Sequence, residues 1–201
     1  MSRRWALLGA LATLVATGCT SDPPPAESFY ELTPSDPGRR FGTPLLDGTL
    51  VVERFDAEGV IGERALLYKG GDGPRLQQYT YHHWTQAPAV LLRDAAITAY
   101  RRAGVATRVV SPSARLLPDY RMTGSIRRLH HRRGSPSGAA VLAVEITIPR
   151  ARDGAALLLE RYRDRAPVAT TRIGDAVTGF RTALTVVLTR SIDDLAARVG
   201  R

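Results

Sequence analysis

Alternating apolar and polar positions dominate this chain and predict a succession of β-strands. In the stretch 76–83, Gln77, Tyr79 and Tyr81 fall on one face of an extended chain and the intervening residues fall on the other. β-branched and apolar content supports the remaining strands, which are bounded by Gly, Pro and Asp. The full set of predicted strands is 29–32, 50–55, 65–69, 76–83, 105–110, 120–129, 139–148 and 155–163.

Two segments change to the three- and four-residue spacing of an amphipathic helix. The first begins at Pro88, a residue suited to the first helical turn, runs to about Arg102 and is stopped by Gly104. The second begins near Asp175 and continues close to the C-terminus. Its apolar stripe, which is typical of a core-facing surface, consists of Val177, Phe180, Leu184, Val187, Leu188, Ile192, Leu195 and Val199.

The order of these elements predicts one α/β domain with a central mixed sheet and helices packed on its faces. Residues 76–110 form a strand–helix–strand unit, and 120–148 form an antiparallel hairpin with a basic turn around 134–138. No internal repeat and no second domain is indicated. The sequence has 201 residues, enough for a single domain with a substantial core.

The N-terminus carries the signature of a lipoprotein signal peptide. Arg3 and Arg4 precede the apolar run 5–15, and the small residues 16–18 lead directly into Cys19. We predict a signal peptide at 1–18 and a diacylglyceryl and N-acyl lipid, palmitate among the acyl chains, on Cys19. An ordinary signal peptide and a transmembrane anchor are the alternatives. The run is shorter than the roughly 20 residues that span a bilayer.

A tether is predicted between the lipid and the domain. Residues 19–28 lack apolar periodicity and contain three consecutive prolines, which favour a stiff, extended linker. The domain then occupies 29–201. Thr20 follows the cysteine in place of the Asp that commonly retains lipoproteins at the inner membrane, so the inner leaflet of the outer membrane, facing the periplasm, is favoured.

Charge and cysteine content narrow the classes of partner. The formal net charge is +9, and all but one of the 28 basic residues are arginine. For an exported protein, this balance favours anionic lipid headgroups or an acidic protein over nucleic acid. Cys19 is the single cysteine, so lipidation leaves no thiol for a disulfide, a nucleophile or a metal ligand.

Catalytic and metal-binding motifs are missing from the sequence. It contains no Gly-x-Ser-x-Gly elbow, no P-loop, no His-Glu-x-x-His and no dinucleotide fingerprint. The histidines form two adjacent pairs, 82–83 and 130–131, whose members point to opposite faces of a strand. One histidine of each pair could still meet across the sheet. We predict no enzyme, no metal and no cofactor beyond the covalent lipid.

Two clusters are candidates for binding. Arg127, Arg128, Arg132 and Arg133 lie around the basic hairpin end and form a candidate patch for anionic lipid or an acidic partner, with a solvated hairpin tip as the alternative. The aromatic group Tyr79, Tyr81 and Trp84 is a candidate partner-binding surface, since Tyr and Trp favour interfaces. Half-buried structural side chains are the equal alternative.

The linear pattern resembles the ABC-type transport auxiliary lipoproteins, the PqiC-like accessory subunits of MCE-type lipid transport systems. The resemblance rests on Cys19 with its tether and on several short motifs in the family's order. These motifs are Phe-Tyr-Glu-Leu-Thr-Pro at 29–34, Leu-Val-Val-Glu-Arg-Phe-Asp-Ala at 50–57, Arg-Ala-Leu-Leu-Tyr-Lys at 64–69, the Tyr, Trp and Pro of 79–88, and Tyr-Arg-Met-Thr-Gly at 120–124.

The resemblance implies a non-catalytic, lipid-anchored periplasmic subunit of an ABC/MCE-type system that moves lipids or other hydrophobic substrates. Its implied partners are the MCE-type protein, which it docks at the outer membrane, and the inner-membrane ABC permease and ATPase. Whether the subunit also forms a homo-oligomer is left open by the resemblance. The alternative function is a periplasmic carrier that holds a lipid itself, between sheet and helices.

Overall fold

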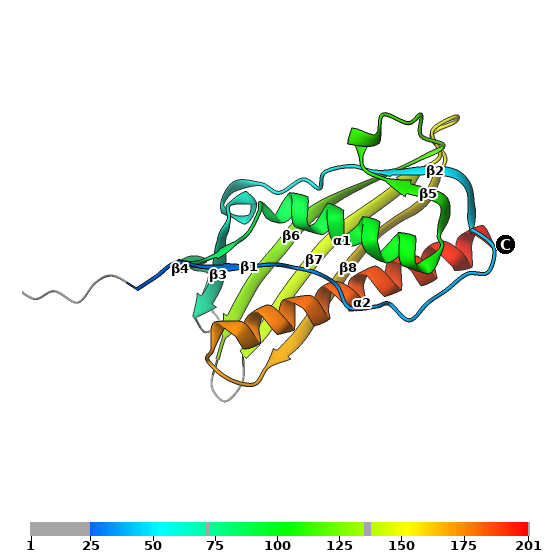
Figure 1. Ribbon diagram of the computed structural model, residues 1–201. Helices are drawn as coiled ribbons and strands as arrows, with labels where there is room; N and C mark the ends of the chain where they lie inside the picture. The colour runs from blue at the N-terminus through cyan, green and yellow to red at the C-terminus, as the bar shows by residue number, and fades with distance from the viewer. Residues whose placement is uncertain (1–24, 71–72, 135–137, 201) are drawn as a thin grey trace, which may run out of the picture.

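The computed structural model describes residues 25–70, 73–134 and 138–200. Within them the chain forms an eight-stranded mixed sheet, two α-helices and two short 3-10 turns (Figure 1). In chain order the elements are β1 (Ser28–Tyr30), β2 (Leu46–Val52), η1 (Gly59–Gly62), β3 (Ala65–Gly70), β4 (Gln77–Trp84), α1 (Pro88–Ala103), β5 (Ala106–Val110), η2 (Pro112–Ala114), β6 (Tyr120–Arg133), β7 (Gly138–Pro149), β8 (Ala156–Val168) and α2 (Ile173–Val199).

One long strand, β6, organises the sheet. Its first edge pairs with β7 in an antiparallel ladder, and β7 pairs in turn with β8. Its second edge is shared along its length by two parallel strands: β2 pairs with residues 120–122 and β3 pairs with residues 131–133. Asp56 bridges to Ser125 between them. A single strand thereby joins the β1-β4-β3 group to the β2-β5 group.

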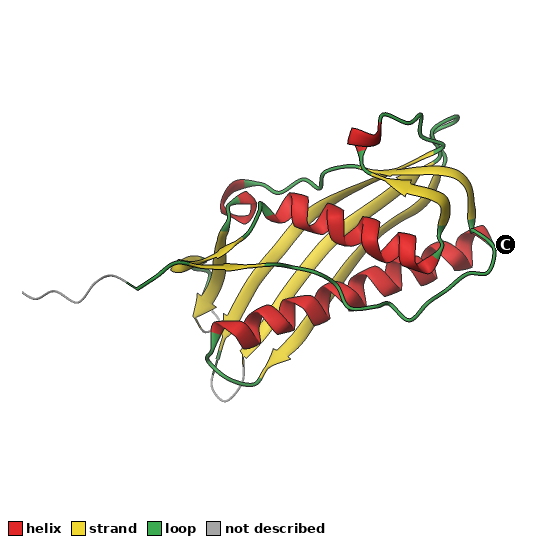
Figure 2. Cartoon of the chain, in the orientation of Figure 1, coloured by secondary structure: helices red, strands yellow, loops and turns green. Residues whose placement is uncertain are grey.

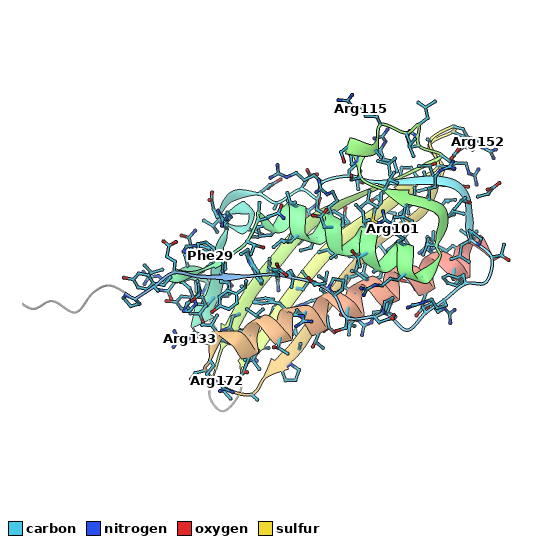
Figure 3. All side chains as sticks on the ribbon, in the orientation of Figure 1. Phe29, Arg101, Arg115, Arg133, Arg152 and Arg172 are labelled. Atoms are coloured by element: carbon cyan, nitrogen blue, oxygen red, sulfur yellow. The ribbon has the colours of Figure 1, made fainter. Side chains whose placement is uncertain are left out.

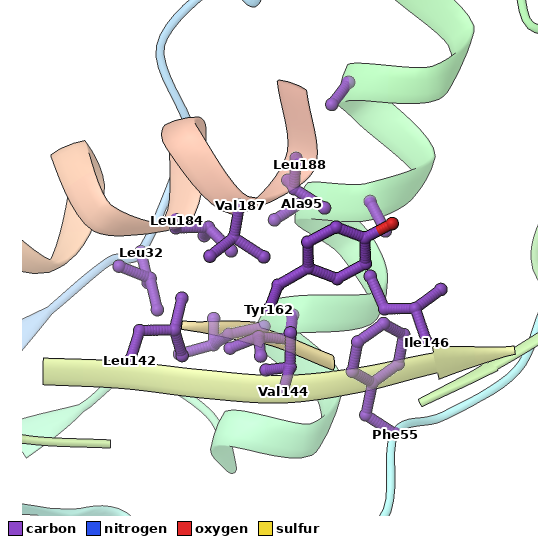
Figure 4. Close-up of a cluster of buried hydrophobic side chains, with 14 of the residues drawn as sticks. Leu32, Phe55, Ala95, Leu142, Val144, Ile146, Tyr162, Leu184, Val187 and Leu188 are labelled. Atoms are coloured by element: carbon purple, nitrogen blue, oxygen red, sulfur yellow. The ribbon is translucent and has the colours of Figure 1, made fainter. Parts of the chain in front are cut away.

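Both helices cover the same face of the sheet (Figures 1 and 2). Side chains from α1, α2 and the covered face fill the space between the layers, as Figure 4 shows for Ala95 of α1, Val144 of β7 and Leu184 of α2. The two helices also contact each other through a buried polar pair, in which the Tyr100 hydroxyl donates to the Ser191 Oγ at 2.8 Å. The hydrogen bond offsets the cost of burying both groups.

The opposite face of the sheet, which we call the open face, carries polar and charged side chains. On β8, exposed Arg161, Arg163 and Arg165 alternate with Tyr162 and Ala166, which are buried against the helical layer. This period of two is the sign of a sheet with one buried face. The predicted mixed α/β fold is confirmed, but both helices lie on one face of the sheet and not on its two faces, because the other face carries polar and charged side chains.

Most predicted elements are observed, and the differences lie at strand ends. Helix α1 begins at Pro88 and ends before Gly104, whose φ of +72° is the left-handed conformation that favours glycine. Strand β2 ends at Val52, three residues before the predicted end. Strand β6 extends to Arg133 and β8 to Val168, so part of the predicted basic turn is strand. Residues 135–137 of that turn lie outside the described part.

Gly124 of β6 is required by the close approach of an aromatic ring. A Cβ atom at this position would lie 2.5 Å from the ring of Phe55, which is buried on it. We expect Gly124→Ala to lower the free energy of unfolding by about 1–3 kcal/mol, because Phe55 must leave its position. Chemical denaturation measures this change. Gly73→Ala, at a site with no atom near the added Cβ, is the control; equal stability of the two variants would contradict this packing.

Candidate functional site: a cationic pocket on the open face

A pocket of about 380 Å³ lies on the open face, between strands β6–β8 and the segment that follows β3. Six cationic side chains line it together with His130, and we call it the cationic pocket. The cations are Lys69, Arg127, Arg128, Arg132, Arg163 and Arg165, and the remaining lining residues are Ile61, Gly73, Pro74, Leu76, Leu129 and Val141. No acidic side chain of the described residues is part of the lining.

The register of three strands places these charges around a depression. Arg128 of β6 pairs with Ala143 of β7, which pairs with Arg163 of β8. In the next row on the same face, Val141 lies between His130 and Arg165. Adjacent strands are about 4.8 Å apart, so the outer members of a row are separated by about 10 Å. The apolar side chain of Val141 in the middle strand lines the pocket between these longer cationic side chains.

The positive charges of the pocket affect the pKa of His130. Burial, followed by the charges of Lys69, Arg128, Arg165 and Arg163, lowers this pKa to about 4. The pKa of the Arg163 guanidinium is also lowered, chiefly by Arg165. Both shifts are those expected where cations are gathered without a counter-charge.

This arrangement predicts a loss of stability between pH 6.5 and pH 4. An unfolded histidine takes up its proton near pH 6.5, whereas His130 in the folded chain resists protonation until about pH 4. The folded state therefore binds fewer protons in this interval, and stability present above pH 6.5 is lost as the pH falls. His131, whose pKa is lowered by burial and by Arg133, acts with the same sign.

We expect the loss to be on the order of 2 kcal/mol, allowing for solvent screening. Urea denaturation at pH 7 and pH 4.5 measures it. His130→Gln, which has no proton to gain, should remove most of the difference. Asp36 and the other carboxyls with lowered pKa values lose their contribution mainly below pH 4, outside this interval. A His130→Gln protein with the wild-type pH dependence would contradict the assignment.

Three of the four arginines of the candidate basic patch lie in the same site. Arg127, Arg128 and Arg132 line the cationic pocket. Arg133, which is labelled in Figure 3, lies with its guanidinium over the ring of Tyr68, 5.2 Å from the centroid. The alternative of a solvated hairpin tip does not hold for the two histidines of this cluster, because His130 and His131 are 8% and 3% exposed.

The aromatic candidates are mostly structural. Trp84 is 1% exposed and packs edge-on against Phe180 of α2, so burial removes its indole from any surface and corrects the interface prediction for this residue. The hydroxyl of half-buried Tyr79 is hydrogen-bonded to His131 Nδ1 at 3.0 Å. The ring of His82 lies edge-on to the same tyrosine. Tyr81 is half-buried and stays a candidate for partner contact.

One histidine of each pair does approach the same tyrosine, although the geometry is not that of a metal site. Both His82 and His131 use Nδ1 in hydrogen bonds to tyrosine hydroxyls, of Tyr30 and Tyr79 respectively. In the described part of the chain, no group of three or more His, Cys, Asp or Glu side chains is placed to hold an ion.

The chain matches the model of a known protein family. The model of the ABC-type transport auxiliary lipoprotein component matches residues 30–192. The chain belongs to this family. Membership confirms the resemblance drawn from the sequence motifs and identifies the protein as an envelope-associated auxiliary component of an ABC-type transport system, whose partners are components of that transporter.

Solved structures agree with this fold. A crystal structure of protein XCC0632 from Xanthomonas campestris, of the DUF330 family, is similar with a TM-score of 0.73 at 20% identity, covering 82% of this chain and 92% of that one. The crystal structure of an uncharacterized protein is similar with a TM-score of 0.61 at 14% identity, covering 86% and 98%. No curated protein matches the chain.

The residues of the lipid anchor lie outside this description. The predicted signal peptide at 1–18, Cys19 and the first part of the tether belong to the residues that the structure does not describe. Within the described residues, neither helix is both long and apolar enough to cross a bilayer.

Sequence reasoning missed half of the cationic pocket. Arg163 and Arg165 come from β8, and Lys69 comes from β3. The signal for the first two was the alternation of arginines at 161, 163 and 165, which the predicted strand end at 163 cut short. Nothing local to Lys69 indicates its neighbours, because its pairing with Arg132 joins residues far apart in sequence.

Proposed function

We propose that this auxiliary lipoprotein is a non-catalytic docking subunit at the periplasmic side of the outer membrane. In this role it is anchored through the lipid on Cys19 and receives the MCE-type protein of a system that moves lipids or other hydrophobic substrates. The MCE-type protein bridges to the inner-membrane permease and ATPase. The observation that carries the proposal is the family match across residues 30–192.

Further support comes from the architecture. Side chains fill the layer between sheet and helices in the described residues, where Leu142 and Ile146 of β7 face Val187 and Leu188 of α2 (Figure 4). The carrier alternative needs a lipid in this layer, so we do not propose it. The open face, with its cationic pocket, is the part of the sheet that stays available for binding.

Site-specific photo-crosslinking in cells tests the docking role. The full-length lipoprotein carries the crosslinker at one of three exposed positions: Leu117 in the loop before β6, 91% exposed; Leu159 on β8, 56% exposed; or Phe29 near the tether, 52% exposed. Trp84, buried in the core, is the negative control position. We expect an MCE-type protein or its permease to be recovered from at least one exposed position after gentle solubilisation.

The matched specificity control is an unrelated outer-membrane lipoprotein with the same tag and crosslinker. Recovery of neither transporter component from any of the three positions, in repeated experiments, would show that the docking role is wrong. The position that crosslinks also identifies the docking face.

A further inference from the structure

The charge of the residues that line the cationic pocket suits the binding of a small anion. Its charges come from three separate elements, with Lys69 on β3, Arg128 on β6 and Arg163 and Arg165 on β8. No described acidic side chain lines it. Elsewhere on the open face the pattern is different, since Arg161 is paired with Glu145 at 2.6 Å. Among the described residues, no acidic side chain forms an ion pair with Lys69, Arg128, Arg163 or Arg165.

Shape and lining select the kind of anion. A volume of about 380 Å³ is near the lower end of the range of about 300–1,000 Å³ for ligand sites, which suits a headgroup better than a whole diacyl lipid. Arginine forks match the oxygens of phosphate and can donate two parallel hydrogen bonds. Apolar Leu76 and Val141 beside the cations suit a ligand with a carbon skeleton attached to its anionic group.

An acidic protein surface fits the same features less well. The cations converge on a depression that Val141 lines at the middle strand, and a broad carboxylate-bearing surface would reach them only with a protruding group. Like charges placed this close are destabilising unless a counter-ion joins them. A compact group with several oxygens satisfies more of the cations at once than separate carboxylates do.

We propose that the cationic pocket binds the phosphate of a phosphorylated headgroup, with Arg128, Arg163 and Arg165 as its principal donors. Lys69 adds a fourth positive charge from the opposite side, and Val141 lines the pocket at the middle strand. The phosphate belongs either to an anionic phospholipid or to a soluble phosphate ester, and the chemistry of recognition is the same for both. This inference is independent of the docking of an MCE-type protein.

Binding to the full-length lipoprotein in uncharged detergent micelles tests the proposal. Isothermal titration compares inorganic phosphate, glycerol 3-phosphate, dihexanoyl phosphatidylglycerol, zwitterionic dihexanoyl phosphatidylcholine and a polyglutamate peptide. We expect the anionic phosphate-bearing probes to bind. Tighter binding of the short-chain phosphatidylglycerol than of glycerol 3-phosphate indicates a membrane lipid as the source; equal binding indicates a soluble ester.

Three variants distinguish phosphate binding in the pocket from nonspecific attraction to the positive charge of the protein. Arg163→Gln combined with Arg165→Gln should weaken phosphate binding at least about tenfold, since each removes a charge-assisted hydrogen bond. Val141→Phe, which narrows the pocket at the middle strand without changing charge, should have a similar effect. Arg161→Gln, on the same face and strand but paired with Glu145, is the matched control and should change binding less than about twofold.

The pKa of His130 is a second measure of phosphate binding, because a structural change without a bound anion would not raise it. The groups that face it are Lys69, Arg127, Arg128, Arg132, Arg163 and Arg165. A bound phosphate offsets these charges, so it should raise the pKa of His130 in an NMR titration. Failure of every phosphate-bearing probe to bind, binding by polyglutamate alone, or unchanged binding by Val141→Phe would each overturn the proposal.

Discussion

Replacing Cys19 with serine will move the full-length protein from the membrane fraction to the soluble periplasmic fraction. The predicted lipid carries three acyl chains, each methylene of which contributes about 0.8 kcal/mol when buried, so it exceeds the two signals needed for stable anchoring. Serine cannot accept the diacylglyceryl group. Cell fractionation followed by immunoblotting measures the change, and nearly all of the protein is expected to shift.

The released domain should stay folded. The core of the described residues is built from side chains between Leu32 and Leu195. The thermal unfolding midpoint of the soluble Cys19→Ser protein should therefore equal that of the lipidated protein within error. Thr20→Ser, which leaves the cysteine in place, is the matched control and should stay in the membrane. A Cys19→Ser protein that remains in the membrane fraction would contradict the lipid anchor.

Trp84→Ala is expected to produce the largest loss of stability among the site residues. The indole is 1% exposed, and its ring centroid lies 5.5 Å from that of Phe180 on α2. Removing a buried aromatic side chain leaves a cavity and costs about 3–5 kcal/mol. For a chain of this size, that corresponds to a fall of about 10 °C or more in the unfolding midpoint. Calorimetry or thermal circular dichroism measures it.

A core role and a partner-binding role for Trp84 predict opposite results for its variants. Trp84→Phe, which keeps an aromatic ring against Phe180, should recover part of the stability. Tyr81→Ala, at a half-buried position on the same strand, should cost less than Trp84→Ala. A Trp84→Ala protein of wild-type stability that no longer crosslinks to its transporter would support a partner-binding role and contradict the core assignment.

Local pattern was enough to predict most individual elements. Pro88 and Gly104 delimit α1 because their backbone preferences act at the positions where a helix starts and stops. The apolar stripe of α2 is regular, and its predicted members Phe180, Leu184 and Leu188 are buried. These features depend on residues close in sequence, so they can be read without the structure.

Strand ends were harder to predict because charge obscured the alternation. His130–Arg133 reads as a polar turn, yet these residues continue β6, since the open face accepts charged side chains at every second position. A bulge between Ile126 and Arg128 also interrupts the strict period of two. For the same reason the predicted end of β8 at Arg163 falls short of Val168.

The cationic pocket could be predicted only in part because it depends on pairing between distant segments. The rows Arg128–Ala143–Arg163 and His130–Val141–Arg165 need the register of two hairpins at once. The parallel pairing of β3 with the end of β6 brings in Lys69. The basic cluster in the sequence indicated where positive charge lies, whereas its convergence with the cations of β3 and β8 on one pocket is a property of the sheet.

Binding between the purified full-length lipoprotein and the purified MCE-type protein of its transport system tests the central claim most directly. Biolayer interferometry with the lipoprotein in uncharged detergent micelles measures it, with an MCE-type protein from an unrelated system as the control. The docking role predicts saturable binding to the matched protein and much weaker binding to the control. Absence of binding to the matched protein, with both proteins shown to be folded, would contradict it.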